Sequence, residues 1–172
     1  MIRKFVLRCV CSFLLIAAYQ YSATLVLAAE ETLLINASPF KISLAMPDGR
    51  TRIGKGSRIR VIVSMENTGK EPISIPGSCV FLDYAFVVTN SRNQPLSLTT
   101  EGTRLTDRSK KICARKNTVL ETKQVGHATL EISDLFDMTM PDEYSISVTR
   151  KARDAKGSVI VAKSQPLKIV VE

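Results

Sequence analysis

The chain has 172 residues, of which 45% are hydrophobic, and a formal net charge of +8. This length suits one domain with a substantial hydrophobic core and is short for two domains of typical size. Without residues 1–29, 21 Lys and Arg remain against 16 Asp and Glu, and a net charge of about +5 is well short of that of a dedicated nucleic-acid binder. We therefore expect no nucleic-acid partner.

Residues 1–29 have the pattern of a secretory signal peptide. Three basic residues precede an apolar run at residues 13–18, and Ala28 and Ala29 supply small residues for cleavage. Polar residues interrupt the apolar run before it reaches the roughly 20 residues of a membrane span. We therefore expect the mature protein to be one domain, residues 30–172, that is secreted or periplasmic and has no transmembrane segment after signal cleavage.

Two of the four cysteines lie in the predicted signal peptide, which leaves Cys79 and Cys113. An even pair in an oxidising compartment indicates a disulfide. In the chain-entropy model, closing a loop of about 35 residues stabilises a domain by roughly 3–4 kcal/mol. The sequence contains no CxxC motif and a single histidine, so neither a redox pair nor a zinc site is indicated.

Apolar and polar residues alternate repeatedly along the mature chain, and each such stretch is bounded by Gly, Pro, Asn or Asp. We expect strands at residues 40–46, 58–66, 79–88, 128–133, 144–148, 158–163 and 167–171. No stretch shows sustained helical periodicity. The predicted fold class is all-β, a single antiparallel two-sheet sandwich of about seven to nine strands.

Two segments depart from this alternation. Residues 79–88 are apolar on both faces except for Asp83, which is typical of a strand in the middle of a sheet or of one packed against a partner. Residues 100–117 are polar and basic without a clear period, and we expect a connecting loop there. Turns are expected at residues 47–49 and 154–157, which contain Gly, Pro or Asp.

Residues 134–148, DLFDMTMPDEYSISV, place Pro141 just before Tyr144 at the start of an alternating strand. This pattern resembles the corner between strands E and F in immunoglobulin-like and fibronectin-type sandwiches. Together with the turn at residues 66–69, it resembles the immunoglobulin-like domains of secreted bacterial proteins. The resemblance implies a buried Tyr144 ring whose hydroxyl bonds upstream backbone.

The chain is also similar to the non-catalytic β-sandwich that precedes the catalytic domain of some secreted Lys-specific metallopeptidases. The HExxH zinc motif of those enzymes is absent from this sequence, so no catalytic residue carries over. A weaker similarity exists to small immunoglobulin-like bacterial proteinase inhibitors.

Few other residues suggest a catalytic or metal site. His127 can be combined on paper with Asp134 and a serine, but no nucleophile-elbow motif supports a catalytic triad. Four carboxylates at residues 134–143 offer oxygen ligands for calcium, although their spacing does not match an EF-hand loop. We expect no enzymatic activity, no cofactor and no metal site.

The strongest functional signal is a cluster of cations in the expected loop. Its members are Arg104, Arg108, Lys110, Lys111, Arg115 and Lys116. Such a cluster suits an anionic partner, such as lipid headgroups, acidic polysaccharide or an acidic protein patch. The alternative is a solvated loop whose charges discourage pairing between sheet edges. The sequence thus favours a non-catalytic binding or structural module that binds a protein or an anionic envelope component. The alternative function is a secreted proteinase inhibitor that uses the same loop.

Overall fold

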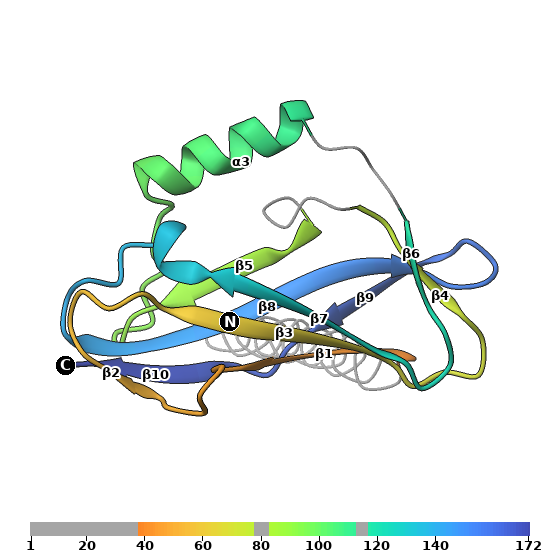
Figure 1. The fold of residues 1–172 in the computed structure, drawn as a ribbon, viewed down its shortest axis with the longest axis horizontal. Helices are drawn as coiled ribbons and strands as arrows, with labels where there is room; N and C mark the ends of the chain where they lie inside the picture. Colours follow the sequence, from red (N-terminus) through yellow and green to blue (C-terminus); the bar gives the residue numbers. More distant parts are fainter. Residues whose placement is uncertain (1–37, 78–82, 113–116) are drawn as a thin grey trace, which may run out of the picture. The chain divides into compact units, whose positions relative to one another are not determined.

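The computed structural model describes residues 38–77, 83–112 and 117–172, without the side chains of residues 109–112 (Figure 1). The predicted signal peptide, both cysteines of the predicted disulfide, Arg115 and Lys116 lie outside the described residues. Residues Ser38–Glu172 form one compact unit. In these described parts, no helix has the length and apolar character needed to cross a membrane.

The smaller sheet contains three antiparallel strands: β1 (Phe40–Ala45), β3 (Arg60–Asn67) and β7 (Val125–Glu131). Strand β3 lies in the middle, paired with β1 on one edge and β7 on the other. Its alternating residues Val61 and Val63 are fully buried, because the period-two pattern places them on the face toward the second sheet. The expected edge strand at residues 40–46 and the strand at residues 58–66 are confirmed.

The larger sheet has seven strands arranged around one long strand, β8 (Asp142–Arg153). The others are β2 (Arg52–Ile53), β4 (Ile73–Ile75), β5 (Ala85–Thr89), β6 (Thr118–Leu120), β9 (Val159–Lys163) and β10 (Leu167–Val171). Strands β10 and β9 pair with successive halves of β8 on one edge, while β5 and β4 pair with it on the other.

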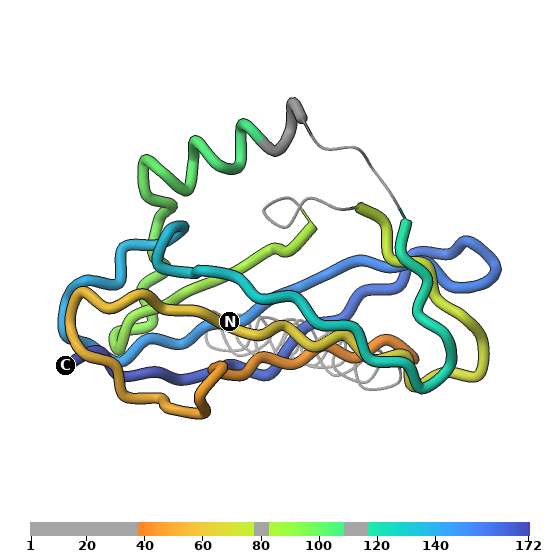
Figure 2. The backbone as a smooth tube through the Cα atoms, viewed as in Figure 1, coloured from red at the N-terminus to blue at the C-terminus, as the bar shows by residue number. Residues whose placement is uncertain are grey.

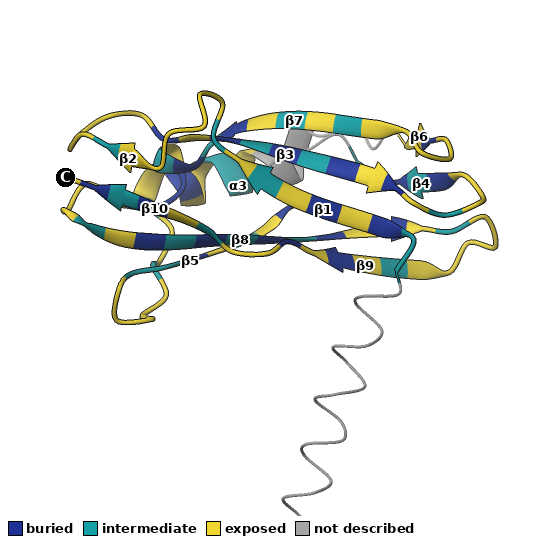
Figure 3. Cartoon of the chain, turned by 90° about the horizontal axis from the view of Figure 1, so that it is seen from below, coloured by how far each residue is buried: buried dark blue, intermediate teal, exposed yellow. Residues whose placement is uncertain are grey.

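The two sheets pack face to face (Figure 3). Phe40, Val61 and Val63 of the smaller sheet and Ile146 and Ile169 of the larger sheet are among the fully buried side chains of this core. The predicted all-β sandwich is confirmed, with ten strands in the described residues instead of about seven to nine.

The expected tyrosine corner is also present. The Tyr144 ring is 3% exposed, and its hydroxyl donates a hydrogen bond to the backbone oxygen of Met140 at 2.9 Å. The bond ties the start of β8 to the chain four residues before Tyr144. Burial of the ring and pairing of its polar tip explain why this position needs a tyrosine.

Two sequence predictions are wrong. Residues Thr100–Ile112, expected to be part of a loop, form the helix α3. Residues 79–88 were expected to form a central strand. Residues 79–82 lie outside the described residues, and in the described part of this range β5 begins at Ala85 and pairs with β8, which is itself the central strand. The apolar pattern was misleading because Val87 points outward and is 51% exposed, whereas Val88 is buried.

Candidate functional site

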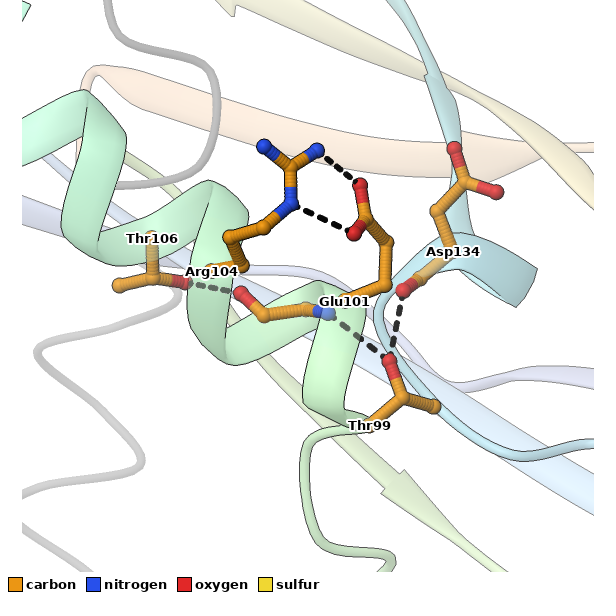
Figure 4. A network of polar contacts seen from close by, with 6 residues as sticks. Thr99, Glu101, Arg104, Thr106 and Asp134 are labelled. Carbon is orange, nitrogen blue, oxygen red and sulfur yellow. Dashed lines mark hydrogen bonds and ion pairs between the residues drawn. The ribbon is translucent and has the colours of Figure 1, made fainter.

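Helix α3 carries the cations that the sequence singled out, and its first turn is fixed to the sandwich by Thr99 (Figure 4). The Thr99 hydroxyl accepts a hydrogen bond from the Gly102 N–H and donates one to the Asp134 backbone oxygen, both at 2.8 Å. The Thr99 N–H donates to the Leu135 oxygen, also at 2.8 Å. Thr99 therefore caps α3 and attaches it to the corner at η1 (Ile132–Asp134).

Gly102 allows this attachment. It is buried, and a Cβ atom at this position would lie 2.6 Å from the Leu135 backbone oxygen. Among the other described side chains of α3, Leu105 and Thr106 are half-buried, and Leu105 packs on the core. The remaining described ones are exposed. Thr99, Gly102 and Leu105 thus attach the described part of α3 to the sandwich.

The structure places four of the six predicted cations on α3. Arg104 and Arg108 are exposed and lie on one side of the helix, since they are four residues apart. Arg104 Nε donates a hydrogen bond to Glu101 Oε2 at 2.7 Å, and this bond lowers the pKa of Glu101. Lys110 and Lys111 also lie on α3. The tube in Figure 2 follows the chain from β5 into this helix.

A buried arginine is the main feature that sequence reasoning missed. Arg150 is 6% exposed, and its guanidinium lies 4.1 Å from the centre of the Tyr84 ring. Its Nη2 lies 3.7 Å from Asp83 Oδ2. Among the residues that the structure describes, its Nε and Nη1 are buried without a hydrogen-bond partner. The signal was available, because Arg150 occupies an inward position in the alternation Tyr144, Ile146, Val148, Arg150, Ala152.

Arg150 lines an open pocket of about 230 Å³ together with Met65, Ile75, Tyr84, Leu120 and His127, among others. Burial raises the pKa of the Tyr84 hydroxyl above its usual value of 10.0. The Arg150 charge acts in the opposite direction, and Asp83 adds to the increase. Arg150 and Asp83, which both line this pocket, carry opposite charges.

The other candidate residues are separated. His127 Nδ1 lies 3.0 Å from Ser64 Oγ, its cross-strand neighbour. Asp134, the carboxylate considered for a triad, lies in η1, and no hydrogen bond joins it to His127 in the described parts of the chain.

The carboxylates considered for calcium serve local turns. A hydrogen bond from the Thr139 hydroxyl lowers the pKa of Asp137, and one from Ser91 lowers that of Asp142. Glu143 accepts a hydrogen bond from Lys168 Nζ at 2.9 Å. Within the described ranges, no three His, Cys, Asp or Glu side chains are grouped as metal ligands.

Comparisons with known proteins show similarity only at the level of structure. No protein-family model and no curated protein matches this chain. A structural-genomics target solved by X-ray crystallography superposes with a TM-score of 0.49 at 8% identity, covering 78% of this chain and 88% of that one. A Bordetella pertussis protein named ApaA gives a TM-score of 0.45 at 9% identity, with coverage of 77% and 91%.

The CARDB domain of the PF1109 protein from Pyrococcus furiosus gives a TM-score of 0.41 at 11% identity, with coverage of 77% and 87%. Because all three scores are below 0.5, no function follows from these similarities.

Proposed function

We propose that this chain is an exported, non-catalytic β-sandwich module that binds an anionic partner through the basic segment centred on α3. The partner is an acidic protein or an anionic component of the envelope. Export rests on the signal-peptide pattern of residues 1–29. The observation that supports binding is the attachment of α3 by its first turn, with Arg104 and Arg108 exposed beyond it.

The role of α3 in stability is small compared with that of a packed helix. Helices in globular proteins gain most of their stability by burying an apolar face. In the described part of α3, Gly102 is buried, and Leu105 and Thr106 are half-buried. The exposed cations Arg104 and Arg108 in this part of α3 are available for contact with another molecule.

The charge of this segment favours an anionic partner. Residues 100–116 contain six Lys and Arg and two acids, Glu101 and Asp107. The Glu101–Arg104 pair offsets one cation, whereas Arg108 projects from the next turn. Cations clustered in this way accelerate association with anionic surfaces, and the attraction weakens as salt is added.

The geometry supports the inhibitor alternative less well. An inhibitor needs an exposed segment that enters a protease cleft in an extended form, as peptides do when they add a strand to an enzyme. Residues Thr100–Ile112 are helical instead. The described part of the loop expected for inhibition, up to Ile112, therefore does not have the conformation that this function needs.

Affinity capture from the native envelope and secreted fractions tests the proposal, with residues 30–172 as bait. The α3 variant replaces Arg104, Arg108, Lys110 and Lys111 with Gln, which keeps helix propensity. A matched variant replaces the exposed cations Lys41, Arg50, Lys55 and Lys70 with Gln, so both baits lose the same charge.

We expect a partner that the wild-type and matched baits retain, that the α3 variant loses, and that salt releases. Equal capture by the α3 variant would show that the site lies elsewhere. If no bait captures a partner, the binding role itself is contradicted.

A further inference from the structure

The two outer faces of the sandwich differ in how their charges are compensated. On the smaller sheet, Lys41 of β1 lies opposite Glu66 of β3. The Glu131 carboxylate of β7 lies 3.2 Å from Arg58 and 3.6 Å from Arg60. Cations on this face are therefore accompanied by acids.

The outer face of the larger sheet has a different pattern. Because Ile146, Val148 and Ala152 of β8 are buried, the odd-numbered residues of this strand point outward. The cross-strand register places Lys151 opposite Val161 and Arg153 opposite Val159, and Lys163 is opposite Thr149. We call Lys151, Arg153, Val159, Val161 and Lys163 the β8–β9 patch.

All five residues of the β8–β9 patch are exposed, with Val159 at 55% and Val161 at 42%. Apolar exposure continues across the sheet: Arg153 lies opposite Ser74, which lies opposite Val119, and Val119 is 51% exposed. The patch therefore combines three cations with exposed valines on neighbouring strands.

The acids of this face lie beyond the β8–β9 patch and have partners of their own. Glu143 lies 2.9 Å from Lys168, and Glu172 lies 3.0 Å from Arg52. No ion pair involves the three cations of the patch in the described parts of the chain.

Three local hydrogen bonds lie at the end of the β8–β9 patch, in the turn that follows β8. Asp154, in the following turn, accepts hydrogen bonds from the backbone N–H groups of Lys156 and Ser158. Arg153 Nη1 donates to the Gly157 oxygen at 2.9 Å, which fixes its side chain at this end of the sheet.

The form of the patch indicates the kind of partner. Neighbouring strands lie about 4.8 Å apart and alternate residues of one strand about 6.7 Å apart, so these side chains project from one continuous surface. The outward positions of β8 and β9 carry no aromatic side chain of the kind on which sugar rings stack. Lys151 and Arg153 lie beside exposed valines on the neighbouring strand. This combination complements a flat surface that is negatively charged on the outside and apolar beneath.

We propose that the β8–β9 patch docks the domain on an anionic lipid bilayer. Lys151, Arg153 and Lys163 contact headgroup phosphates, and Val159 and Val161 lie against the interface between headgroups and acyl chains. This site lies on the sheet, whereas the proposed partner site lies on α3, so either can fail without the other.

Vesicle co-sedimentation tests the docking site. The probe is residues 30–172, the expected mature domain, which contains the whole described core. The vesicles contain phosphatidylglycerol and phosphatidylcholine in equal parts, and pure phosphatidylcholine vesicles serve as a reference. We expect the protein to partition into the anionic vesicles and to be released by salt.

Two variants carry equal changes of charge. The patch variant replaces Lys151, Arg153 and Lys163 with Thr, and the control replaces Lys41, Lys55 and Lys70 with Thr. The patch variant should lose partitioning on the order of a hundredfold, and the control only about threefold or less. Circular dichroism and a melting curve confirm that both remain folded.

A third variant, Val159→Thr with Val161→Thr, leaves the charge unchanged. It should weaken partitioning several-fold and make it more sensitive to salt. Unchanged partitioning would overturn the docking of the valines at the interface.

Three outcomes would overturn the site. The wild-type protein could fail to partition into anionic vesicles. Binding to an immobilised acidic polysaccharide without binding to vesicles would be such a result. The patch and control variants could lose partitioning equally, which would reduce the effect to net charge. Substitution of the α3 cations with Gln could abolish partitioning while the patch variant keeps it, which would assign the lipid contact to α3.

Discussion

The guanidinium of Arg150 lies 4.1 Å from the centre of the Tyr84 ring and 3.7 Å from the Asp83 carboxylate. Arg150 is 6% exposed, so its charge has lost almost all contact with solvent. A cation over an aromatic face recovers about 0.5–2 kcal/mol of interaction energy. This contact and the nearby carboxylate explain how a cation is held at a core position of β8.

Replacement of Arg150 should show how much this arrangement stabilises the fold. Arg150→Ala removes the partner of Tyr84 and leaves Asp83 without its nearby cation, so we expect a loss of about 3 kcal/mol in unfolding free energy. Arg150→Met should cost less, because Met fills the space and carries no unpaired nitrogen atoms. Urea denaturation measures both.

The exposed Arg153 is the control, and its replacement by Ala should change the unfolding free energy by about 0.5 kcal/mol or less. Equal losses for Arg150→Met and Arg150→Ala would show that the charge, and not the packing of the side chain, dominates.

Two tyrosines should make the protein sensitive to alkali. Burial raises the pKa values of Tyr84 and Tyr144 above 10.0, and nearby carboxylates add to both increases. A raised pKa in the folded state means that folding favours the neutral hydroxyl. This contribution is complete below the unfolded pKa and is lost as the pH rises through the folded pKa.

We therefore expect the unfolding free energy to fall above about pH 10, where the unfolded tyrosines ionise. The combined variant Tyr84→Phe with Tyr144→Phe should lose less stability than the wild type between neutral and alkaline pH. Denaturation curves across this range test the prediction, and identical pH profiles would contradict it.

Substitution of Gly102 should reverse the usual helix preference. Ala is normally about 1 kcal/mol more favourable than Gly inside a helix. Here the added Cβ would lie 2.6 Å from the Leu135 oxygen, so Gly102→Ala must displace the start of α3. We expect a loss of about 1–3 kcal/mol and faster hydrogen exchange of the Thr103 amide.

The exposed Thr100 offers a matched site in the same turn of α3. Thr100→Ala should leave the exchange rate of the Thr103 amide nearly unchanged. A more stable Gly102→Ala protein would show that α3 moves away from η1 without cost.

The disulfide between Cys79 and Cys113 stays a prediction, since both residues lie outside the described ranges. Its basis is the even pair of cysteines in the expected mature chain of an exported protein.

Reduction should lower the melting temperature of residues 30–172, with a stability loss of roughly 3–4 kcal/mol in the chain-entropy model. The double variant Cys79→Ser with Cys113→Ser should match the reduced protein and show no further effect of reductant. Mass spectrometry that detects two free thiols in the exported protein would refute the pairing.

Much of the sandwich was predictable because local patterns specify it. Alternation at Val61 and Val63 and at Ile146 and Val148 predicts which side chains face the core, and both predictions are confirmed. The Asp154–Gly157 turn is also present, with the Gly157 N–H bonded to the Asp154 oxygen at 3.0 Å. Tyr144 was predictable for the same reason, since its partner Met140 is only four residues away.

Helix α3 was missed because its apolar periodicity is short. It contains only two large apolar residues, Leu105 and Ile112, which lie seven positions apart and therefore on one face of the helix. The Thr99 cap is a local signal for the start of the helix. The fit of Gly102 against Leu135 leaves no local signal, because Leu135 is more than thirty positions away.

By itself, the sequence determined the fold class, the inward faces of the main strands and the cluster of cations at residues 104–116. Tertiary structure alone decided that Arg104, Arg108, Lys110 and Lys111 lie on a helix and that Arg150 stacks on Tyr84. It also decided that Lys151, Arg153 and Lys163 lie together on one face of the larger sheet. The physical reason is that alternation is set by the backbone of each strand, whereas the neighbours of an outward side chain depend on which strands pair and in which register.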